Sequence, residues 1–495
     1  MRKNWNIRYS YILLFLIALT TQSVSTAQVT NPPSRTGGDG GGLGGLTLQQ
    51  LKDSALHNNI AIRNARHSID AAQQQRKEAF TKYFPSVSGT GLWFNADKGM
   101  AKMDMNPADF ISPEMGASLA QMFPAEALAA LGSPVSISMM KNGTIAGVSA
   151  VQPVFAGGQI INGNRLAKVG EDVSRLQLQL SENEVEKQTE QYYWQLVSLL
   201  EKMKTIEAVQ SLLADIYKDV DVAVRAGVAM RNDLLQVQLR QNDVESQKLK
   251  VKNGIFIVKQ LLGQYAKLTP SSPTPDSPTP GPSRGEGSIY NFDIILPDID
   301  QQDYSLPSPR EGMGVGLLGL LGLLPEYQLL NKQVEATKLQ KKMEVGKNLP
   351  SVGVGAGYNY HNLLENDRTF GMVFATVSIP ISDWWCGSHA IKRKKIEQQK
   401  AEEQLADNSE LLKIRMQKAW NDVEEARQQL QIAQRSIDQA EENLRLNRDY
   451  YRAGTSKMSD LLEAQLLYQQ SLDHRTDAYA DYQNKLLEYR QATGQ

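Results

Sequence analysis

The stretch Ser351-Val-Gly-Val-Gly-Ala-Gly-Tyr-Asn-Tyr360 decides the fold class of this chain. Its valines, alanine and tyrosines take alternate positions, and serine, glycine and asparagine take the positions between them. Successive side chains of a β-strand point to opposite faces of the sheet. This strand would therefore have one apolar face and one face of small and polar side chains, which is typical of a strand that borders lipid.

Three more strands are predicted from the surroundings of this one. A partner follows at about Phe370–Ile379. The preceding word, Asn348-Leu-Pro-Ser-Val352, resembles Tyr83-Phe-Pro-Ser-Val87, so the first half of the chain should contain an equivalent strand pair. We place it at about Ser86–Phe94 and Gly143–Gln152. Alternation is weaker in this pair, and the assignment depends on the repeat.

The chain is duplicated. Arg225-Ala226-Gly227 recurs as Arg452-Ala453-Gly454, and Asp233-Leu-Leu235 recurs as Asp460-Leu-Leu462, both at an offset of 227 residues. Three-letter words recur easily by chance, but a shared offset does not. Each copy is therefore predicted to contain, in order, one helix, two short strands and two long helices.

Long helices follow the second strand of each copy. In the first copy, residues spaced three and four apart form a coiled-coil seam with one polar interruption. They are Leu196, Leu199, Met203, Ile206, Gln210, Leu213, Tyr217 and Val220. Adding 227 gives the second seam, Val423, Ala426, Leu430, Ala433, Ile437, Ala440, Leu444 and Asn447. Gly227 and Gly454 are predicted to end these helices. Asp233 and Asp460 should then lie near the start of the next helix, so each copy folds back as a helical hairpin.

The first copy has 38 extra residues between its strands. We expect an enlarged hairpin loop, in which methionines supply pliable packing. Metal binding by their thioethers is the less favoured alternative. The methionines are Met100, Met103, Met105, Met115, Met122, Met139 and Met140.

The chain begins with a pattern typical of a secretory signal peptide. Arg2 and Lys3 precede the apolar run Tyr11–Leu19, and Ser25-Thr-Ala27 supplies the small residues of a cleavage site. The alternative, a membrane anchor, would need roughly 20 apolar residues. We therefore expect the mature chain to begin at Gln28.

Composition excludes several functional classes. The 53 Lys and Arg balance 54 Asp and Glu, so a basic nucleic-acid binder is not expected. A single cysteine, Cys386, excludes an intramolecular disulfide framework, and the five histidines do not have metal-ligand spacing. The sequence contains no residues whose spacing would suit a catalytic nucleophile–base pair or a phosphate-binding loop. We therefore expect no enzyme activity, no cofactor, no metal and no catalytic residue.

Two segments are expected to be linkers. One is the Gly-rich residues 28–46, and the other is the Pro- and Ser-rich residues 268–324. The second contains the apolar run Val315–Leu324, which either docks against the helices or contacts a partner. The predicted order is then signal peptide (1–27), linker (28–46), first repeat (47–267), linker (268–324) and second repeat (325–495).

Four strands cannot form a spanning sheet alone, because the two edges would expose unpaired backbone groups to lipid. Three chains would supply twelve strands, which is enough to close a barrel. The same three chains would contribute long helices that continue below the sheet, so the chain is predicted to be mainly α and to form a hollow tube, partly in the membrane and partly in the space beneath it.

At this point the chain resembles the TolC-type outer-membrane efflux proteins. The resemblance rests on the Leu46–Asn59 opening, the two Pro-Ser-Val words, Gln152-Pro-Val-Phe-Ala-Gly-Gly158, the paired Arg-Ala-Gly turns and Glu463-Ala-Gln465. It covers nearly the whole mature chain except the Gly- and Pro-rich inserts. It implies a homotrimer in the outer membrane that extends into the periplasm, in contact with outer-membrane lipid. Its fold class would be mainly α, with long helical hairpins forming a periplasmic α-barrel and four strands per chain pooled into a trimeric 12-stranded outer-membrane β-barrel. It further implies a passive exit duct, driven by an inner-membrane pump through a periplasmic adaptor protein.

The resemblance also implies two sites. The tip that meets the adaptor would consist of Arg225, Ala226, Gly227, Arg452, Ala453 and Gly454. The pore gate would involve Asp460 and Glu463, with Tyr451 nearby. Asp460 has an alternative as a helix-start carboxylate, and the equivalent place of Asp233 favours such a structural role. The family often has a basic residue two positions after the glycine, where this chain has Ser456.

Alternative functions stay open. The same duct could serve type I protein secretion or polysaccharide export, because the pump chooses the substrate. A periplasmic coiled-coil scaffold is a remote alternative, and it predicts no β-structure.

Overall fold

The computed structural model describes residues 45–98, 101–106, 111–124, 135–139, 142–268, 290–297, 320–363, 367–381 and 383–494. The chain divides into two units, Met1–Gly44 and Gly45–Gln495, of which only the second is described. The predicted signal peptide and nearly all of the Gly-rich linker therefore lie outside the described residues. So do residues 269–289 and 298–319 of the Pro- and Ser-rich linker.

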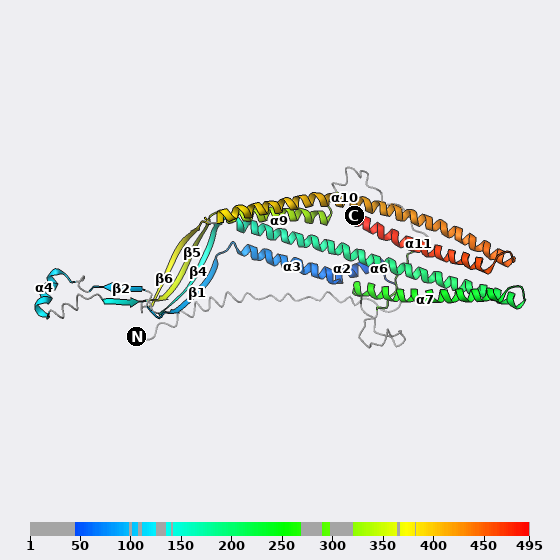
Figure 1. Cartoon of the computed structure of the whole chain (residues 1–495), viewed down its shortest axis with the longest axis horizontal. Helices are drawn as coiled ribbons and strands as arrows, with labels where there is room; N and C mark the ends of the chain where they lie inside the picture. Colours follow the sequence, from blue (N-terminus) through cyan, green and yellow to red (C-terminus); the bar gives the residue numbers. More distant parts are fainter. Residues whose placement is uncertain are drawn as a thin grey trace, which may run out of the picture. The chain divides into compact units, whose positions relative to one another are not determined.

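Helices and strands appear in the same order twice in the second unit (Figure 1). The first series is α2 (Leu48–Asn58), α3 (Ile60–Thr81), β1 (Ser86–Asn95), β4 (Asn142–Ala156), α6 (Gln159–Arg225) and α7 (Arg231–Tyr265). The second is α9 (Pro325–Lys347), β5 (Ser351–Asn362), β6 (Asp367–Ser378), α10 (Asp383–Arg452) and α11 (Met458–Thr493). The predicted fold class is confirmed: the chain is mainly helical, and all four predicted strands form.

The four strands form one antiparallel sheet in the order β1-β4-β5-β6. Their register aligns Val87, Ala150, Ala356 and Val373 in a single row across the sheet. Along β5, alternation extends this row through Val352, Val354, Tyr358 and Tyr360, as predicted from Ser351–Tyr360, whereas β1 has Gly89 and Gly91 on the same face. The side chains of Val87 and Val373 are 69% and 87% exposed, so this face is uncovered in the single chain.

The opposite face has a different character. It mixes small and polar with aromatic side chains, because Thr90, Gly147 and Asn359 lie in one row by register with Phe370. On this face Phe374 packs over Gly355, where a β-carbon would lie 2.5 Å from its ring. Within the described residues, β1 and β6 have a partner strand on one side only. Two sheet edges are therefore open.

The insert between β1 and β4 is more ordered than the enlarged loop predicted from the sequence. It contains the helix α4 (Pro113–Met122) and a two-stranded antiparallel sheet of β2 (Ala101–Met105) and β3 (Val135–Met139). Ser112 caps α4, because its hydroxyl accepts a hydrogen bond from the Met115 amide at 3.4 Å. Of the seven methionines, Met100 and Met140 lie outside the described residues.

The predicted helical seams are buried. Leu196, Ile206, Leu213 and Val220 of α6 are at most 3% exposed, and the other four members are half-buried. In α10 the first six members, Val423 to Ala440, are buried as well. The seam of α6 packs on α7 and on Met458 and Leu461 of α11, which joins the two hairpins in one apolar cluster.

The apolar run Val315–Leu324 was expected either to dock against the helices or to contact a partner. Its described residues dock against the helices. Leu321 and Leu324 are buried against Met416 of α10. In the sequence the run ends directly before α9, much as α2 ends one residue before α3 in the first copy. None of the described helices combines the length and the apolar run that crossing a membrane requires.

A close backbone contact fixes the point where β4 passes into α6. Gly157 has φ of 59°, and a β-carbon there would press against the carbonyl oxygen of Gly346 in α9. Glycine is needed at position 157 both for its positive φ and for this approach. The first glycine of the Gly157-Gly158 pair, part of the stretch Gln152–Gly158, is therefore required by the local backbone.

We predict that Gly157→Ala destabilises the protein by about 2–4 kcal/mol, from the positive φ and the collision with Gly346. The matched control is Gly170→Ala in the middle of α6, where a β-carbon meets no atom within 4 Å. Because alanine favours helix, this change should be neutral or stabilising by about 0.5–1 kcal/mol. Thermal unfolding of the purified protein measures both. Equal midpoints for the two variants would contradict the packing argument.

Candidate functional site

The paired Arg-Ala-Gly turns have the same geometry. α6 ends at Arg225, Gly227 has φ of 74°, and the Val228 amide donates to the Ala223 carbonyl at 2.9 Å. After α10, Gly454 has φ of 73°, and the Thr455 amide donates to the Tyr450 carbonyl at 2.9 Å. Both are helix ends in which a left-handed glycine lets the chain reverse. The predicted ends of the long helices are confirmed.

Asp233 and Asp460 start the two return helices in the same way. The carboxylate of Asp233 accepts the Met230 amide at 3.2 Å, and that of Asp460 accepts the Lys457 amide at 3.2 Å. The contacts therefore show Asp460 as a helix-start carboxylate, which is the structural alternative to a gate residue. Its side chain is nevertheless exposed, so the carboxylate also faces solvent at the tip.

The environment of Asp460 keeps it ionised. The hydrogen bond from the Lys457 amide lowers the pKa of this carboxyl, and the hydroxyls of Ser456 and Ser459, both at 3.0 Å, lower it further. Ser456 stands where the family often has a basic residue, and here it donates a hydrogen bond to the acid. This tip therefore holds its negative charge down to lower pH than an isolated aspartate would.

A groove of about 870 Å³ separates the two turns. Its floor is apolar, because Val220, Met458 and Leu461 are buried beneath it. Across it, the Arg452 guanidinium lies 3.5 Å from the Asp219 carboxylate, so one exposed ion pair links the two hairpins. Such a pair contributes at most about 1 kcal/mol and can open readily.

The other predicted site residues fall into different environments. Tyr451 is half-buried in the apolar cluster, and burial, followed by the nearby charge of Asp233, raises the pKa of its phenol. Glu463 is exposed on α11, one helical turn after Asp460. Arg225 is exposed and pairs with Asp221 at 2.7 Å. Ala226, Gly227, Ala453 and Gly454 are exposed too.

A buried polar cluster behind the tip was not predicted. The guanidinium of Arg240 on α7 donates to Gln465 Oε1 at 3.1 Å and to Gln469 Oε1 at 2.9 Å on α11. Gln465 and Gln469 are 0% and 3% exposed. The stretch Glu463-Ala-Gln465 carries part of the family resemblance, but nothing in it identifies Arg240 as the donor. This cluster ties the return helices of the two copies together.

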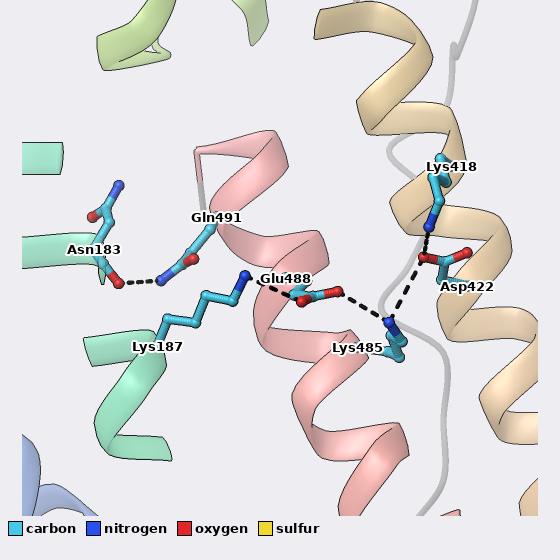
Figure 2. Close-up of polar contacts among 7 residues, drawn as sticks. All are labelled: Asn183, Lys187, Lys418, Asp422, Lys485, Glu488 and Gln491. Atoms are coloured by element: carbon cyan, nitrogen blue, oxygen red, sulfur yellow. Dashed lines mark hydrogen bonds and ion pairs between the residues drawn. The ribbon is translucent and has the colours of Figure 1, made fainter. Parts of the chain in front are cut away.

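A chain of charges holds the two copies together at the other end of α11 (Figure 2). Lys187 of α6 lies 3.2 Å from Glu488 of α11, and Lys485 lies 3.3 Å from the same carboxylate. Lys485 also lies 3.9 Å from Asp422 of α10. Lys485 and Glu488 are three residues apart on α11, but Lys187 and Asp422 are far from them in the sequence, so no local pattern could have predicted the contacts between the helices.

One buried carboxyl on α11 lacks a matching donor. Asp473 Oδ1 is buried and has no hydrogen-bond partner among the described residues. Burial raises the pKa of Asp473 to about 6, with Lys202 opposing and Asp477 adding to the increase. The folded protein therefore holds a proton on Asp473 at a pH where the unfolded chain has already released it.

We predict a pH-dependent stability from Asp473. Its folded pKa is the higher one, so the stability that Asp473 contributes should fall as the pH rises from about 4 to about 6 and then level off. After allowance for partial solvent screening, the change should be about 1–2 kcal/mol. Thermal unfolding across this range, compared between wild type and Asp473→Asn, measures it. The stability of the wild type relative to Asp473→Asn should show this decline, and the stability of the wild type relative to the exposed control Asp407→Asn should not change over the same pH range. Parallel curves for wild type and Asp473→Asn would contradict a protonated Asp473.

Residues 328–495 match the profile of the family described as outer membrane efflux protein. This segment covers α10, α11 and both strands of the second copy, with nearly all of α9. A search of curated proteins gave no match.

Solved structures with the same fold cover 90% of this chain. The outer-membrane channel CmeC of Campylobacter jejuni has a TM-score of 0.66 at 15% identity, with 85% of that chain covered. VceC, an outer membrane protein of Vibrio cholerae, has a TM-score of 0.66 at 13% identity, with 96% covered. The open-state MtrE outer-membrane channel of Neisseria gonorrhoeae has a TM-score of 0.63 at 14% identity, with 88% covered. Identities this low establish the fold alone.

The resemblance identified in the sequence is therefore confirmed: the second repeat matches the outer membrane efflux protein family, and the described chain as a whole has the fold of the outer-membrane channels.

Proposed function

We propose that this protein is the outer-membrane exit duct of a tripartite efflux system. Three chains would form a passive channel that crosses the outer membrane and extends into the periplasm. An inner-membrane pump would supply the energy, and a periplasmic adaptor would join pump and duct. Drugs or other small molecules would pass through without chemical change, so the protein would not be an enzyme.

The observation that carries this proposal is the four-stranded sheet with two open edges. One face of the sheet has an exposed apolar row, from Val87 to Val373, and the other mixes small and polar side chains with the apolar ones of Phe370, Met372 and Phe374 on β6. An open edge cannot persist in lipid, where unpaired backbone groups have no water to bond. Pairing β6 of one chain with β1 of the next, three times, would remove every edge and leave the apolar face toward lipid.

The helical hairpins support the periplasmic half of the proposal. Each strand continues into a helix at the same end of the sheet, and the long helices α6 and α10 lead to the two turns (Figure 1). At the first turn Val228 and Met230 are 80% and 74% exposed, beside Arg225, Ala226 and Gly227. Exposed apolar side chains at a turn are suited to contact with another protein. We assign this tip, with Arg452, Ala453 and Gly454, to the adaptor.

The gate would lie at the second turn. Asp460 and Glu463 are exposed one helical turn apart, and three copies would place rings of carboxylates around the exit. Tyr451 is packed between the hairpins rather than free, so it would act as a packing contact of the closed tip. The Arg452–Asp219 pair would have to open if the hairpins separate.

We predict that Asp460→Asn with Glu463→Gln lowers the cation preference of the channel several-fold, because the rings lose their charge but keep their shape. Single-channel recording of the purified protein in planar bilayers measures the reversal potential in a salt gradient. The matched control, Glu403→Gln with Asp407→Asn, removes two exposed carboxyls from α10, far along the helix from the turn.

Two results would contradict the proposal at different levels. An unchanged cation preference in the tip variant would contradict the gate, and so would an equal change in the control. A wild-type protein that is recovered without detergent and produces no conductance would contradict the duct itself.

A further inference from the structure

Positive charge is concentrated where the helices meet the sheet. Residues 70–82, 159–171, 338–349 and 383–396 hold 13 Lys and Arg against 5 Asp and Glu. The whole chain, with 53 against 54, has no such excess. These four segments, which we call the basic belt, belong to α3, α6, α9 and α10 and adjoin the same end of the sheet.

Within the belt, α3 and α6 form a groove of about 800 Å³. Its lining includes Arg76, Lys77, Phe80, Tyr83, Arg165 and Lys168. The two walls are held together by Asn164, whose Nδ2 donates to the Ala79 carbonyl at 2.8 Å and to the Ile160 carbonyl at 2.9 Å. The groove is therefore a fixed feature of the helix pair.

The cations of the groove are of two kinds. Arg76 lies 2.9 Å from the buried Glu171, which also pairs with Arg175 at 2.8 Å. Lys77, Arg165 and Lys168 are exposed, and among the described residues none of them has an ion pair or side-chain hydrogen bond. Three positive charges around the groove are therefore free to hold an anion.

The groove also has an apolar side next to the sheet. The Phe80 ring lies 5.6 Å from the rings of Tyr83 and Phe84, and β1 begins at Ser86. Phe80 is 55% exposed, and Ile161, on the α6 side, is also exposed. A small anion in water needs no apolar wall, whereas a lipid headgroup with its acyl chains needs both kinds of surface.

We propose that the groove between α3 and α6 binds the headgroup of an anionic phospholipid from the periplasmic leaflet. This inference rests on the proposed function, because spanning strands would place their helix-side ends at that membrane surface. Lys77, Arg165 and Lys168 would surround the phosphate, and Phe80 and Tyr83 would lie beside the glycerol and the first acyl carbons. Cations and aromatic rings are the side chains that favour this depth.

Binding of fluorescent phosphatidylglycerol to the full chain in neutral detergent tests the site. The wild type should bind it more tightly than the matched phosphatidylcholine probe. Lys77→Gln, Arg165→Gln and Lys168→Gln combined should weaken phosphatidylglycerol binding on the order of 100-fold, since each cation near a lipid surface contributes about a fivefold factor. If the triple variant does not assemble, Lys168→Gln alone should bind about fivefold more weakly.

The control variant combines Lys250→Gln, Lys252→Gln and Arg435→Gln, which remove three exposed cations outside the belt. It should bind as the wild type does. Equal binding by the groove variant and the wild type would overturn the proposal, as would equal loss in the control. In bilayers of neutral phosphatidylcholine, the groove variant should keep the wild-type ion selectivity. A loss of anion permeation with unchanged lipid binding would mean that the groove lines the pore, and would overturn the proposal too.

The lipid site and the duct fail in different ways. A wild-type protein that inserts and conducts but does not prefer phosphatidylglycerol would contradict the site alone. A wild-type protein that neither inserts nor conducts would contradict the duct on which the site rests.

Discussion

The backbone edges of β1 and β6 constrain the rest of this structure. Each presents a row of N–H and C=O groups with no partner in the single chain. The same sheet also exposes apolar side chains, which are unfavourable in water. A longer sheet within the chain would have met this constraint, but four strands are too few to close a barrel. Assembly of several chains meets it, and it also places the apolar face toward lipid.

The helices continue the order that the strands impose. α3, α6, α9 and α10 adjoin the same end of the sheet, so the order of strands sets the order of helices (Figure 1). The glycine contact between Gly157 and Gly346 fixes one of these junctions. Further along, buried side chains of α6 pack on α7 and α11, and the two copies share one core. The shared core therefore fixes the two turns relative to each other, at the end of the long helices that is far from the sheet.

Polar contacts between the copies are arranged differently at the two ends of α11. Near its C-terminus, Glu488 and Lys485 join α6 to α10 through several half-buried ion pairs (Figure 2). Near the turn, one exposed ion pair, Arg452–Asp219, connects the hairpins at the surface. Behind it, Arg240 and its two buried glutamines form a further tie. A tip that opens would break the exposed pair at little cost, while the far end stays locked.

The sequence predicted the features that depend on local periodicity. Alternation identified β5, and β6 was predicted as its partner. The repeat carried the assignment to β1 and β4, where alternation is weaker. The positive φ of Gly227 and Gly454 also followed from residue type. Contacts between distant segments did not, because nothing in the word around Gln465 specifies Arg240 as its partner. The prediction of a loop for the insert missed β2 and β3, although Ala101–Met105 and Val135–Met139 each alternate apolar and polar residues. Five residues of alternation are too few to identify a strand by themselves.

Amide hydrogen exchange of β1 and β6 in the detergent-solubilised protein tests the central claim most directly. Alternate amides of an edge strand point away from its one neighbour and exchange freely unless another strand accepts them. If three chains close a barrel, all amides of β1 and β6 should be protected as strongly as those of β4 and β5. Rapid exchange at alternate positions of β1 and β6, with β4 and β5 protected, would show that the edges remain open and would contradict the duct.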